Sequence, residues 1–437
     1  MKNKLINNIE KKIAIVFVSG SIGELDWNLP ILDFLLNEGF DLKIIILKKE
    51  VYESIKKNKL INNFISQNSK IEVIFQGGCF IEKIEHYVYL FYRILIKLNI
   101  YRYSLISNIF NFLSKIFHEV FFSRMPSYIF RNKKNRYLFL SEFPSLRRPR
   151  DAWIRKKFIN SIFLYHPHSP NIYAEDLDQR YKSPENIDYN KRYFLLLGHQ
   201  LDYLKINDER ELAATNLEKV FVGHPKWSHK WLDRNRCKLK NFSSTSLDKN
   251  KTSILILSRG PAGSSDEKYY KNLIESTIKS IQKSIPNCNL FVKKHPREKL
   301  THWEQFSKKY SSINIINDHI HMIAPNVDFV ITFLGSGAVD CYEMGVPVIE
   351  FCNLNQYTKG GMFIKEGNYT TIYRNLGIVI PANNEEELQN AIYGLVKTNY
   401  KLQSNIAHPF YKELIGLSNT WDKKIRSILA SHNFISN

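Results

Sequence analysis

The stretch KIAIVFVSGSIGELDWNLPILDFLLNEGFDLKIIILKK, residues 12 to 49, decides the fold class of this chain. Its first segment, KIAIVFVSG, reads as a buried strand, NLPILDFLLNEGF as an amphipathic helix that ends at Gly39, and DLKIIILKK as a second strand. Two parallel strands need such a helical crossover between them. The stretch therefore predicts a βαβ unit and an open α/β domain built around it.

Apolar strands recur along the chain and predict two domains. KIEVIFQGG, RYLFLSEF and NSIFLYHP extend the first domain over residues 1 to 225. Residues 226 to 250 are polar and end in a run rich in Ser, Thr and Asn, which is typical of a linker. Residues 251 to 437 then form a second α/β domain with closing C-terminal helices. Its predicted strands are 253 to 258, 289 to 294, 313 to 317, 329 to 334 and 346 to 351.

The charge balance is strongly basic. Lys and Arg number 62 against 42 Asp and Glu, a formal net charge of +20. This favours an anionic partner, which can be nucleic acid, a phosphorylated small molecule or an acidic membrane surface. The five cysteines are scattered and lack a CxxC pair, so neither a disulfide framework nor a zinc site is indicated. We expect a cytoplasmic protein, with peripheral contact at the inner face of the cytoplasmic membrane as an open alternative.

Residues 81 to 125 depart from this rhythm. They are dense in aromatic and aliphatic side chains with Lys and Arg between them. One interpretation is a pair of buried helices under the first domain. The other is a basic amphipathic surface that touches the membrane together with the basic runs at 131 to 136 and 147 to 150. No nucleic-acid-binding module is visible, so nucleic acid is not an expected partner.

Open α/β sheets bind ligands outside the carboxyl ends of their strands, so the residues that follow each strand carry the chemistry. After the first strand, SGSIGELDW offers Gly20 and Gly23 for close backbone approach, and Glu24 and Asp26 as carboxylates. A dinucleotide site would need GxGxxG here and an acidic residue after the second strand, where this chain has Lys48. A nicotinamide or flavin enzyme is therefore set aside, and no cofactor is expected.

The segment LYHPHSP, 164 to 170, places His166 and His168 directly after an apolar strand of the first domain, where Pro167 and Pro170 restrict the backbone around them. A neutral imidazole there can take a proton from an attacking hydroxyl. Histidines in such positions are also common structural residues, so both interpretations stay open.

Two loops of the second domain suit phosphate. LSRGPAGSSDEKYY supplies amides, hydroxyls and one cation at a helix start without being a Walker motif. TFLGSGAVDCYEMGVPVIEF makes a tight turn into a helix, and Glu343, about two helical turns later, can accept hydrogen bonds from ribose hydroxyls. The loop residues concerned are Ser258, Arg259, Gly260, Gly263, Ser264 and Ser265 in the first, and Gly335, Ser336 and Gly337 in the second.

Two Rossmann-like domains, with a glycine-bearing loop in the first and a GSG helix start in the second, resemble GT-B glycosyltransferases. Within that superfamily, VKKHPRE is similar to the HP motif of bacterial sialyltransferases and capsule Kdo transferases, whose histidine helps bind the cytidine nucleotide of the donor. The resemblance implies His295 and Pro296 on the nucleotide and Ser336 on the donor phosphate. Those sialyltransferases take their base from an acidic D-D/E-G motif, which this chain replaces with GELD, leaving Asp26 or Glu24.

A second resemblance concerns SIFLYHPHSPNIYAEDL, YFLLLGHQLDYLK and VFVGHPKW, which are similar in order to segments of the CDP-glycerol glycerophosphotransferases of teichoic acid synthesis. In that family a strand-end histidine of an HGTP-like motif deprotonates the acceptor. His166 takes the corresponding place here, although HPHS is not HGTP. His166 is therefore the first-choice base and Asp26 the second.

Together these resemblances imply a metal-independent GT-B transferase that moves a sugar, for example a sialic acid- or Kdo-like one. The donor would be CMP- or CDP-activated, and the acceptor a bacterial surface polysaccharide or lipid-linked glycan. Several alternatives stay open. One is a CDP-glycerol-type glycerophosphotransferase. Another is a UDP-sugar glycosyltransferase, or an enzyme like the nondehydrogenating UDP-GlcNAc 2-epimerases, which share the Ser-Gly turn and GVPV. The last is a basic binding protein for nucleic acid or membrane.

Overall fold

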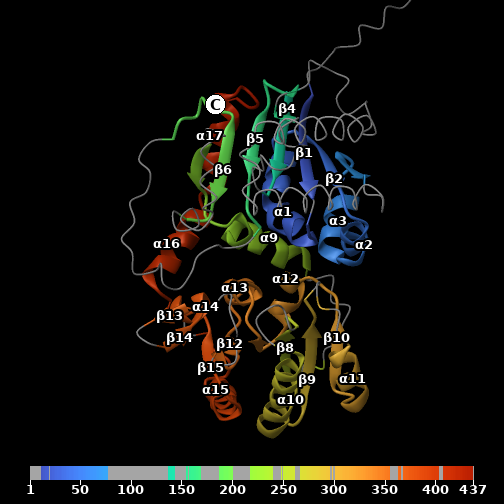
Figure 1. Cartoon of the computed structure of the whole chain (residues 1–437), viewed down its shortest axis with the longest axis vertical. Helices are drawn as coiled ribbons and strands as arrows, with labels where there is room; N and C mark the ends of the chain where they lie inside the picture. Colours follow the sequence, from blue (N-terminus) through green and yellow to red (C-terminus); the bar gives the residue numbers. More distant parts are fainter. Residues whose placement is uncertain are drawn as a thin grey trace, which may run out of the picture.

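The computed structural model describes residues 11–18, 20–76, 136–142, 154–155, 157–168, 187–199, 217–239, 248, 250–260, 266–295, 298, 301–354, 363–365, 368–402 and 407–436. Two parallel sheets flanked by helices lie one above the other in Figure 1. The predicted fold class, two Rossmann-like α/β domains in a GT-B arrangement, is confirmed. Some predicted features lie outside the described residues: the segments 81 to 125, 131 to 135 and 147 to 150, and Gly263, Ser264, Ser265 and Pro296.

The first sheet has seven parallel strands in the order β3-β2-β1-β4-β5-β6-β7. They are β1 (Lys12–Val18), β2 (Asp41–Ile46), β3 (Ile71–Phe75), β4 (Arg136–Ser141), β5 (Ile162–Tyr165), β6 (Tyr193–Leu197) and β7 (Glu218–Phe221). Its helices include α1 (Ile22–Asn37), α2 (Lys49–Lys57) and α3 (Lys59–Ser66). All of β1 after Lys12 is buried, as expected of a central parallel strand covered on both faces. β1, α1 and β2 are the predicted βαβ unit.

Helix α1 begins at Ile22, six residues earlier than the predicted start at Asn28. The carboxylate of Glu24 accepts hydrogen bonds from the backbone N–H groups of Gly20 and Ser21, which would otherwise lack partners at the helix start. The predicted start was too late because the segment contains Pro30, and proline is most common in the first turn of a helix. Glu24 and Asp26 therefore lie on the first turns of α1 and not in a loop.

The second sheet has six parallel strands in the order β10-β9-β8-β11-β12-β15. They are β8 (Thr252–Leu257), β9 (Cys288–Lys293), β10 (Ile313–Ile316), β11 (Phe329–Thr332), β12 (Val348–Phe351) and β15 (Ile380–Ala382), and β13 (Phe363–Lys365) pairs with β14 (Asn368–Thr370) in a separate ribbon. The helices here are α10 (Glu267–Ser284), α11 (His302–Lys309), α12 (Ile320–Ile323), α13 (Gly337–Glu343), α14 (Ile372–Asn375) and α15 (Glu385–Lys397). The five predicted strands correspond to β8 to β12, each within two residues at either end.

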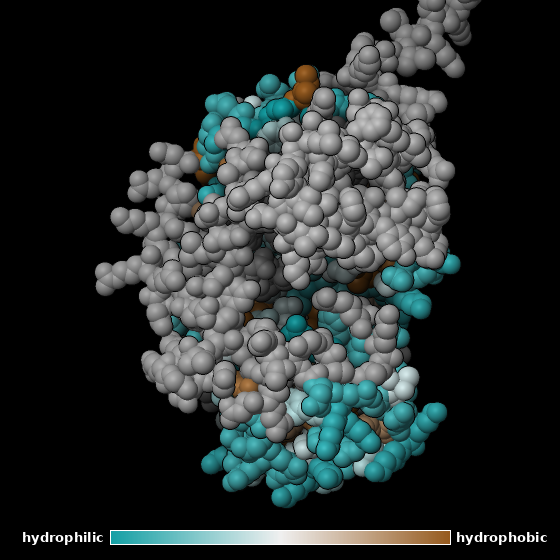
Figure 2. Space-filling model, viewed as in Figure 1, coloured by the Kyte–Doolittle hydropathy of each residue, from teal (hydrophilic) through white to brown (hydrophobic). Residues whose placement is uncertain are grey.

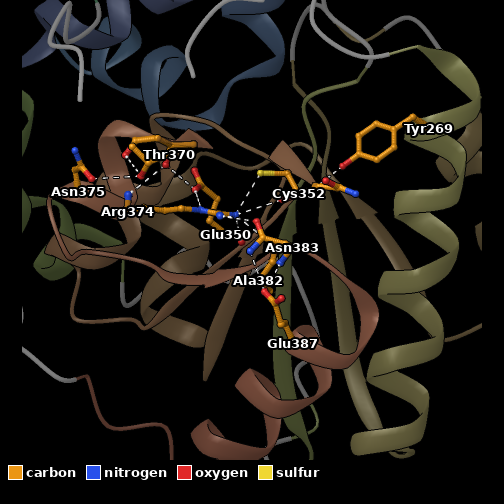
Figure 3. A network of polar contacts seen from close by, with 11 residues as sticks. Tyr269, Glu350, Cys352, Thr370, Arg374, Asn375, Ala382, Asn383 and Glu387 are labelled. Atoms are coloured by element: carbon orange, nitrogen blue, oxygen red, sulfur yellow. Dashed lines mark hydrogen bonds and ion pairs between the residues drawn. The ribbon is translucent and has the colours of Figure 1, made fainter. Parts of the chain in front are cut away.

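A buried polar network fastens β12, α14 and β15 together (Figure 3). The guanidinium of Arg374 donates to Glu350 at 2.8 Å and to Asn383 at 2.7 Å. The Thr371 hydroxyl donates to the same Glu350 carboxylate at 2.7 Å. Glu350 has no exposed surface. Arg374 therefore fixes α14, and with it the neighbouring Tyr373, which faces the space between the two sheets.

The chain crosses between the two sheets more than once. After β7 come a short 3-10 turn, η4 (Pro225–Trp227), and helix α9 (His229–Leu239), which lies between the sheets in Figure 1. Near the C-terminus α16 (Pro409–Ser418) packs with the second sheet, whereas α17 (Trp421–Ser431) packs in the core of the first. The division into 1–225, 226–250 and 251–437 stays a prediction, but α17 lies on the first sheet.

The two crossings touch at Gly223. Its φ of +66° suits glycine, and a Cβ there would lie 2.2 Å from the backbone nitrogen of Ser418. The Ser418 hydroxyl accepts a hydrogen bond from the backbone N–H of His224 at 2.8 Å. This contact holds the start of η4 against the end of α16.

The surface of the second sheet's helices is hydrophilic. Figure 2 shows hydrophilic side chains gathered at the lower end of the molecule, where α10, α11 and α15 lie in Figure 1. Within the described segments, no helix combines the length and the apolar character needed to cross a membrane.

Candidate active site

A cavity of about 440 Å³ lies between the carboxyl ends of the two sheets. The start of α1, the loop after β5 and η4 line it from the first sheet, and the loops after β8, β9 and β11 line it from the second. Its polar lining includes Ser21, Gly23, Asp26, His168 and Lys226 on one side, and Ser258, Arg259, Lys293, Lys294, His295, His319, Gly335, Ser336, Gly337 and Asp340 on the other. Ligands of α/β sheets bind at such edges.

Lys226 connects the two walls of the cavity. Its Nζ lies 2.7 Å from Asp26 Oδ2 on α1 and 3.1 Å from Asp340 Oδ2 on α13. Only 4% of Lys226 is exposed. Burial works against its charge, but the two carboxylates outweigh burial and raise the pKa of Lys226 above its ordinary value. Lys226 is therefore a permanent cation that is already neutralised by protein groups.

Asp26, the second-choice base, has both carboxylate oxygens occupied. Its Oδ1 lies 2.7 Å from His319 Nε2. The backbone N–H of His321 donates to His319 Nδ1, so Nε2 carries the proton and donates to Asp26. Burial lowers the pKa of His319 to about 4, which keeps it neutral at pH 7. Although burial would raise it, the pKa of Asp26 is held well below its usual range by His319 and Lys226, so this carboxylate is a weak base.

Asp340 is a second carboxylate whose oxygens are occupied by protein donors. The sequence analysis did not identify it as a site residue. Trp227 Nε1 donates to it at 3.0 Å and His321 Nε2 at 3.2 Å. Burial would raise its pKa, but Lys226 and His321 lower it to about 2. The sequence did hold a signal for its partner His321, since His319 and His321 come shortly after the strand β10.

His166 and His168 occupy different places. His166 is buried, and its Nδ1 donates to Asn28 Oδ1 at 2.9 Å. Burial lowers its pKa to about 3, and its Nε2 is buried with no hydrogen-bond partner among the described residues. His166 is not among the described residues that line the cavity, whereas His168 is. His168 Nδ1 is hydrogen-bonded to the carboxylate of Glu142, which follows β4.

Three buried histidines follow three neighbouring strands of the first sheet. They are His166 after β5, His199 after β6 and His224 after β7, and burial lowers the pKa of each. All three are neutral at pH 7. In the part of the chain that the structure describes, no three His, Cys, Asp or Glu side chains gather so as to hold a metal ion.

Residues of both predicted phosphate loops line the cavity. The residues of the first loop differ in whether they are exposed to a ligand or bonded to other protein groups. The Ser258 hydroxyl donates to Glu298 at 2.6 Å and accepts from Trp303 Nε1 at 2.9 Å. Its hydrogen bonds are therefore made to residues around the second sheet. Gly260, with φ +70°, also packs against Glu298. Arg259 is exposed and donates to the carbonyl of Leu334 at 3.1 Å.

The GSG turn and the HP histidine both line the cavity. The Ser336 hydroxyl does not cap α13, and a Cβ on Gly337 would lie 3.0 Å from Leu257 Cδ1, so a larger residue there would have to displace that side chain. His295 lies at the carboxyl end of β9 in the same wall. The GSG turn, His295 and Arg259 thus line the same cavity, and their role in binding phosphate stays a prediction.

Glu343 and Glu24 point elsewhere. The hydroxyl of Tyr411 on α16 donates to Glu343 at 2.5 Å, and burial raises the pKa of Glu343. Glu24 serves the start of α1 through the hydrogen bonds described above. Neither is among the described residues that line the cavity, and Asp340, one helical turn before Glu343, lies there instead.

Comparison with known proteins shows what the fold resembles. No protein-family model matches the chain, and no curated protein matches it. A putative UDP-N-acetylglucosamine 2-epimerase from Listeria monocytogenes matches with a TM-score of 0.54 at 13% identity, covering 97% of both chains. The Neisseria meningitidis UDP-GlcNAc 2-epimerase bound to UDP-GlcNAc gives 0.52 at 11%, covering 96% of this chain and 99% of that one.

The Methanocaldococcus jannaschii enzyme in complex with UDP-GlcNAc and UDP gives a TM-score of 0.51 at 13% identity, covering 95% of this chain and 98% of that one. At such low identity the likeness concerns the fold alone. The chain thus has the GT-B-like fold of two parallel α/β sheets that these epimerases share.

Proposed function

We propose that the chain is an enzyme that binds a nucleotide-activated sugar in this cavity and transfers the sugar to a hydroxyl group of an acceptor. One observation carries the proposal: His168, hydrogen-bonded to Glu142, lines one wall of the cavity, and residues of types suited to phosphate line the other. His168 with Glu142 stands on the first-sheet side, and Arg259, His295 and Ser336 stand on the second-sheet side.

His168 replaces His166 as our choice for the general base. Its Nδ1 is hydrogen-bonded to Glu142, which sets the tautomer so that Nε2 can take the proton of an attacking hydroxyl. The Glu142 carboxylate would also stabilise the imidazolium that forms. His166 is buried and is not among the described residues that line the cavity, so it is not placed to contact a substrate there.

The leaving nucleotide would be stabilised by fixed positive groups. Arg259 and the amides of the GSG turn line the same wall, and donors aimed at developing phosphate charge lower the barrier most in a site that excludes water. Ser336 and His295 would complete the contacts to phosphate and nucleoside.

A uridine nucleotide is our first candidate, in place of the cytidine nucleotide that the sequence motifs implied. Two of the similar structures contain UDP-GlcNAc, whereas nothing found supports CMP or CDP. A glycan or lipid-linked acceptor, and work at the inner membrane face, stay predictions from the basic charge.

Epimerisation at C2 is the second candidate, because the fold is shared with UDP-GlcNAc 2-epimerases. That reaction needs a base to remove a proton from carbon. The cavity carboxylates Asp26 and Asp340 are held ionised by Lys226 and by neutral histidine donors, which makes both weak bases. Asp26 and Asp340 are therefore poor candidates for the base of an epimerisation.

A thermal-shift panel of UDP, UDP-GlcNAc, CMP, CDP, GDP and ADP tests the proposal, since a ligand of the native state raises the melting temperature. We expect UDP and UDP-GlcNAc to raise it. A response to CMP and CDP alone would restore the cytidine interpretation, and no response to any nucleotide would contradict the proposed function. Formation of an epimer from UDP-GlcNAc without any acceptor would select the second candidate.

A further inference from the structure

Lys293 differs from the other lysines of the cavity. Lys226 is bound by two carboxylates, and Lys294 donates to Glu304 at 2.6 Å. Lys293 Nζ instead donates to a backbone carbonyl, that of Asp318, at 2.8 Å. The Asp318 carboxylate lies 2.9 Å from Lys59. Among the described residues, no carboxylate lies within ion-pair distance of Lys293. An ammonium has three donors, so two remain for acceptors in the cavity.

Lys293 also lies beside the phosphate-binding wall. It is the last residue of β9, paired with Leu257 of β8, and its carbonyl accepts from the backbone N–H of Ser258 at 3.1 Å. Arg259 follows directly, and His295 lies two residues beyond Lys293. All three line the same cavity.

Resting on the proposed function, we propose that Lys293 holds a phosphate oxygen of the bound nucleotide and takes up a proton as that phosphate arrives. An ammonium–phosphate hydrogen bond is charge-assisted, so it forms only with the protonated amine. Lys293 is thus both a binding residue and the group that makes binding depend on pH.

The charged groups around Lys293 support this. Asp26 on α1, Lys226 in η4, His319 before α12 and Arg259 after β8 line the same cavity, with Lys294 and His295 on the strand end of Lys293 itself. The charge of Asp318, which pairs with Lys59, also acts on Lys293. Burial lowers the pKa of Lys293 to about 8, Asp26 and Asp318 oppose that shift, and Lys226 adds to it.

Three of the neighbouring groups titrate far from pH 8. Asp26 has a pKa well below its usual range, Lys226 one above its usual range, and His319 one of about 4. Near pH 8 the free protein therefore holds about half of its Lys293 as neutral amine. A phosphate oxygen favours the charged form and would raise this pKa, so protons must be bound.

Calorimetry with UDP-GlcNAc in two buffers of different ionisation enthalpy measures the protons taken up. Its diphosphate stays ionised in this range, so it contributes none. We expect an uptake of about half a proton at pH 8 and close to none at pH 6.5. Lys293→Arg should bind without proton uptake, because guanidinium is always charged. Lys293→Met should bind about tenfold or more weakly. Lys271→Met, on the exposed face of α10, is the matched control and should behave as wild type.

The outcomes separate the two proposals. Binding without proton uptake at pH 8, or uptake that persists in Lys293→Arg, would overturn the role of Lys293 and leave the proposed function standing. If no nucleotide binds, the proposed function fails, and sulfate, a dianion across this range, tests Lys293 alone. Sulfate should then raise the melting temperature of the wild type more at pH 7 than at pH 9.5, and it should raise that of Lys293→Met less, without this difference between the two pH values. Equal sulfate effects in wild type and Lys293→Met would overturn the inference.

Discussion

His168 and His166 stand two residues apart but are expected to answer differently to substitution. His168→Gln should lower the rate of sugar transfer by roughly 10²- to 10⁴-fold, the usual loss when a general base is removed, and leave nucleotide affinity unchanged. His166→Gln should change the rate less than about tenfold, because a glutamine amide can still donate to Asn28. Rates of UDP release with saturating donor would check both. Equal losses in the two variants would contradict the assignment.

Lys226 joins α1 of the first sheet to α13 of the second through two buried ion pairs. Lys226→Met would leave Asp26 and Asp340 without their shared cation. We expect a loss of about 3–5 kcal/mol in the free energy of unfolding, as for other broken buried ion pairs. Urea unfolding measures this. Lys230→Met is the control, because Lys230 pairs with Asp422 at the surface with 83% of its side chain exposed, and should cost less than about 1 kcal/mol.

The sequence predicted which residue types follow the strands, but not the side chains with which they form hydrogen bonds and ion pairs. The sequence placed His166, His168, Arg259, His295 and the GSG turn after strands, and the fold rule brought most of them to one cavity. It could not tell which of the two histidines faces that cavity, because the choice depends on Asn28, 138 residues from His166. Lys226 read as part of a linker, since its partners Asp26 and Asp340 lie 200 and 114 residues away.

At the scale of elements, the ion pair of Arg374 with Glu350 links α14 to β12. Arg374→Met would leave the fully buried Glu350 without its cation (Figure 3), and we expect a loss of about 3–5 kcal/mol in the free energy of unfolding. The double variant Arg374→Met with Glu350→Leu should recover much of the loss, because no buried charge then remains. Arg426→Met is the matched surface control, since 53% of its side chain is exposed. Urea unfolding of the four proteins checks the order.

The strands and the long helices follow from apolar runs and spacing, which is why the βαβ unit and β8 to β12 were predictable. Where a helix packs is a different matter. The apolar face of α17 predicts a buried helix. Nothing in its residues indicates whether that face packs on the first sheet or on the second. The start of α1 was equally hidden, because Pro30 suggested a later beginning and the bonds from Gly20 and Ser21 to Glu24 depend on the folded turn.

At the scale of the whole molecule, four buried histidines should make the fold sensitive to mild acid. Burial lowers the pKa of His166 to about 3 and of His319 to about 4, from the usual 6.5, and lowers those of His199 and His224. Unfolding exposes them, so between pH 6.5 and these lower values the unfolded chain binds more protons than the folded one. The contribution of these histidines to stability is therefore fully present above pH 6.5 and is lost as the pH falls below it.

His166 and His319 should each remove about 2 kcal/mol from the free energy of unfolding between pH 6.5 and 5, since one pKa unit corresponds to about 1.4 kcal/mol. Urea unfolding at pH 7, 6 and 5 measures the slope. His166→Gln should make that slope shallower by close to one proton whatever its own stability, whereas His229→Gln, at the exposed start of α9, should leave it unchanged. If the wild-type protein were as stable at pH 5 as at pH 7, these imidazoles could not be buried and neutral, and the assignment of His319 as the neutral donor that holds Asp26 ionised would fail with them.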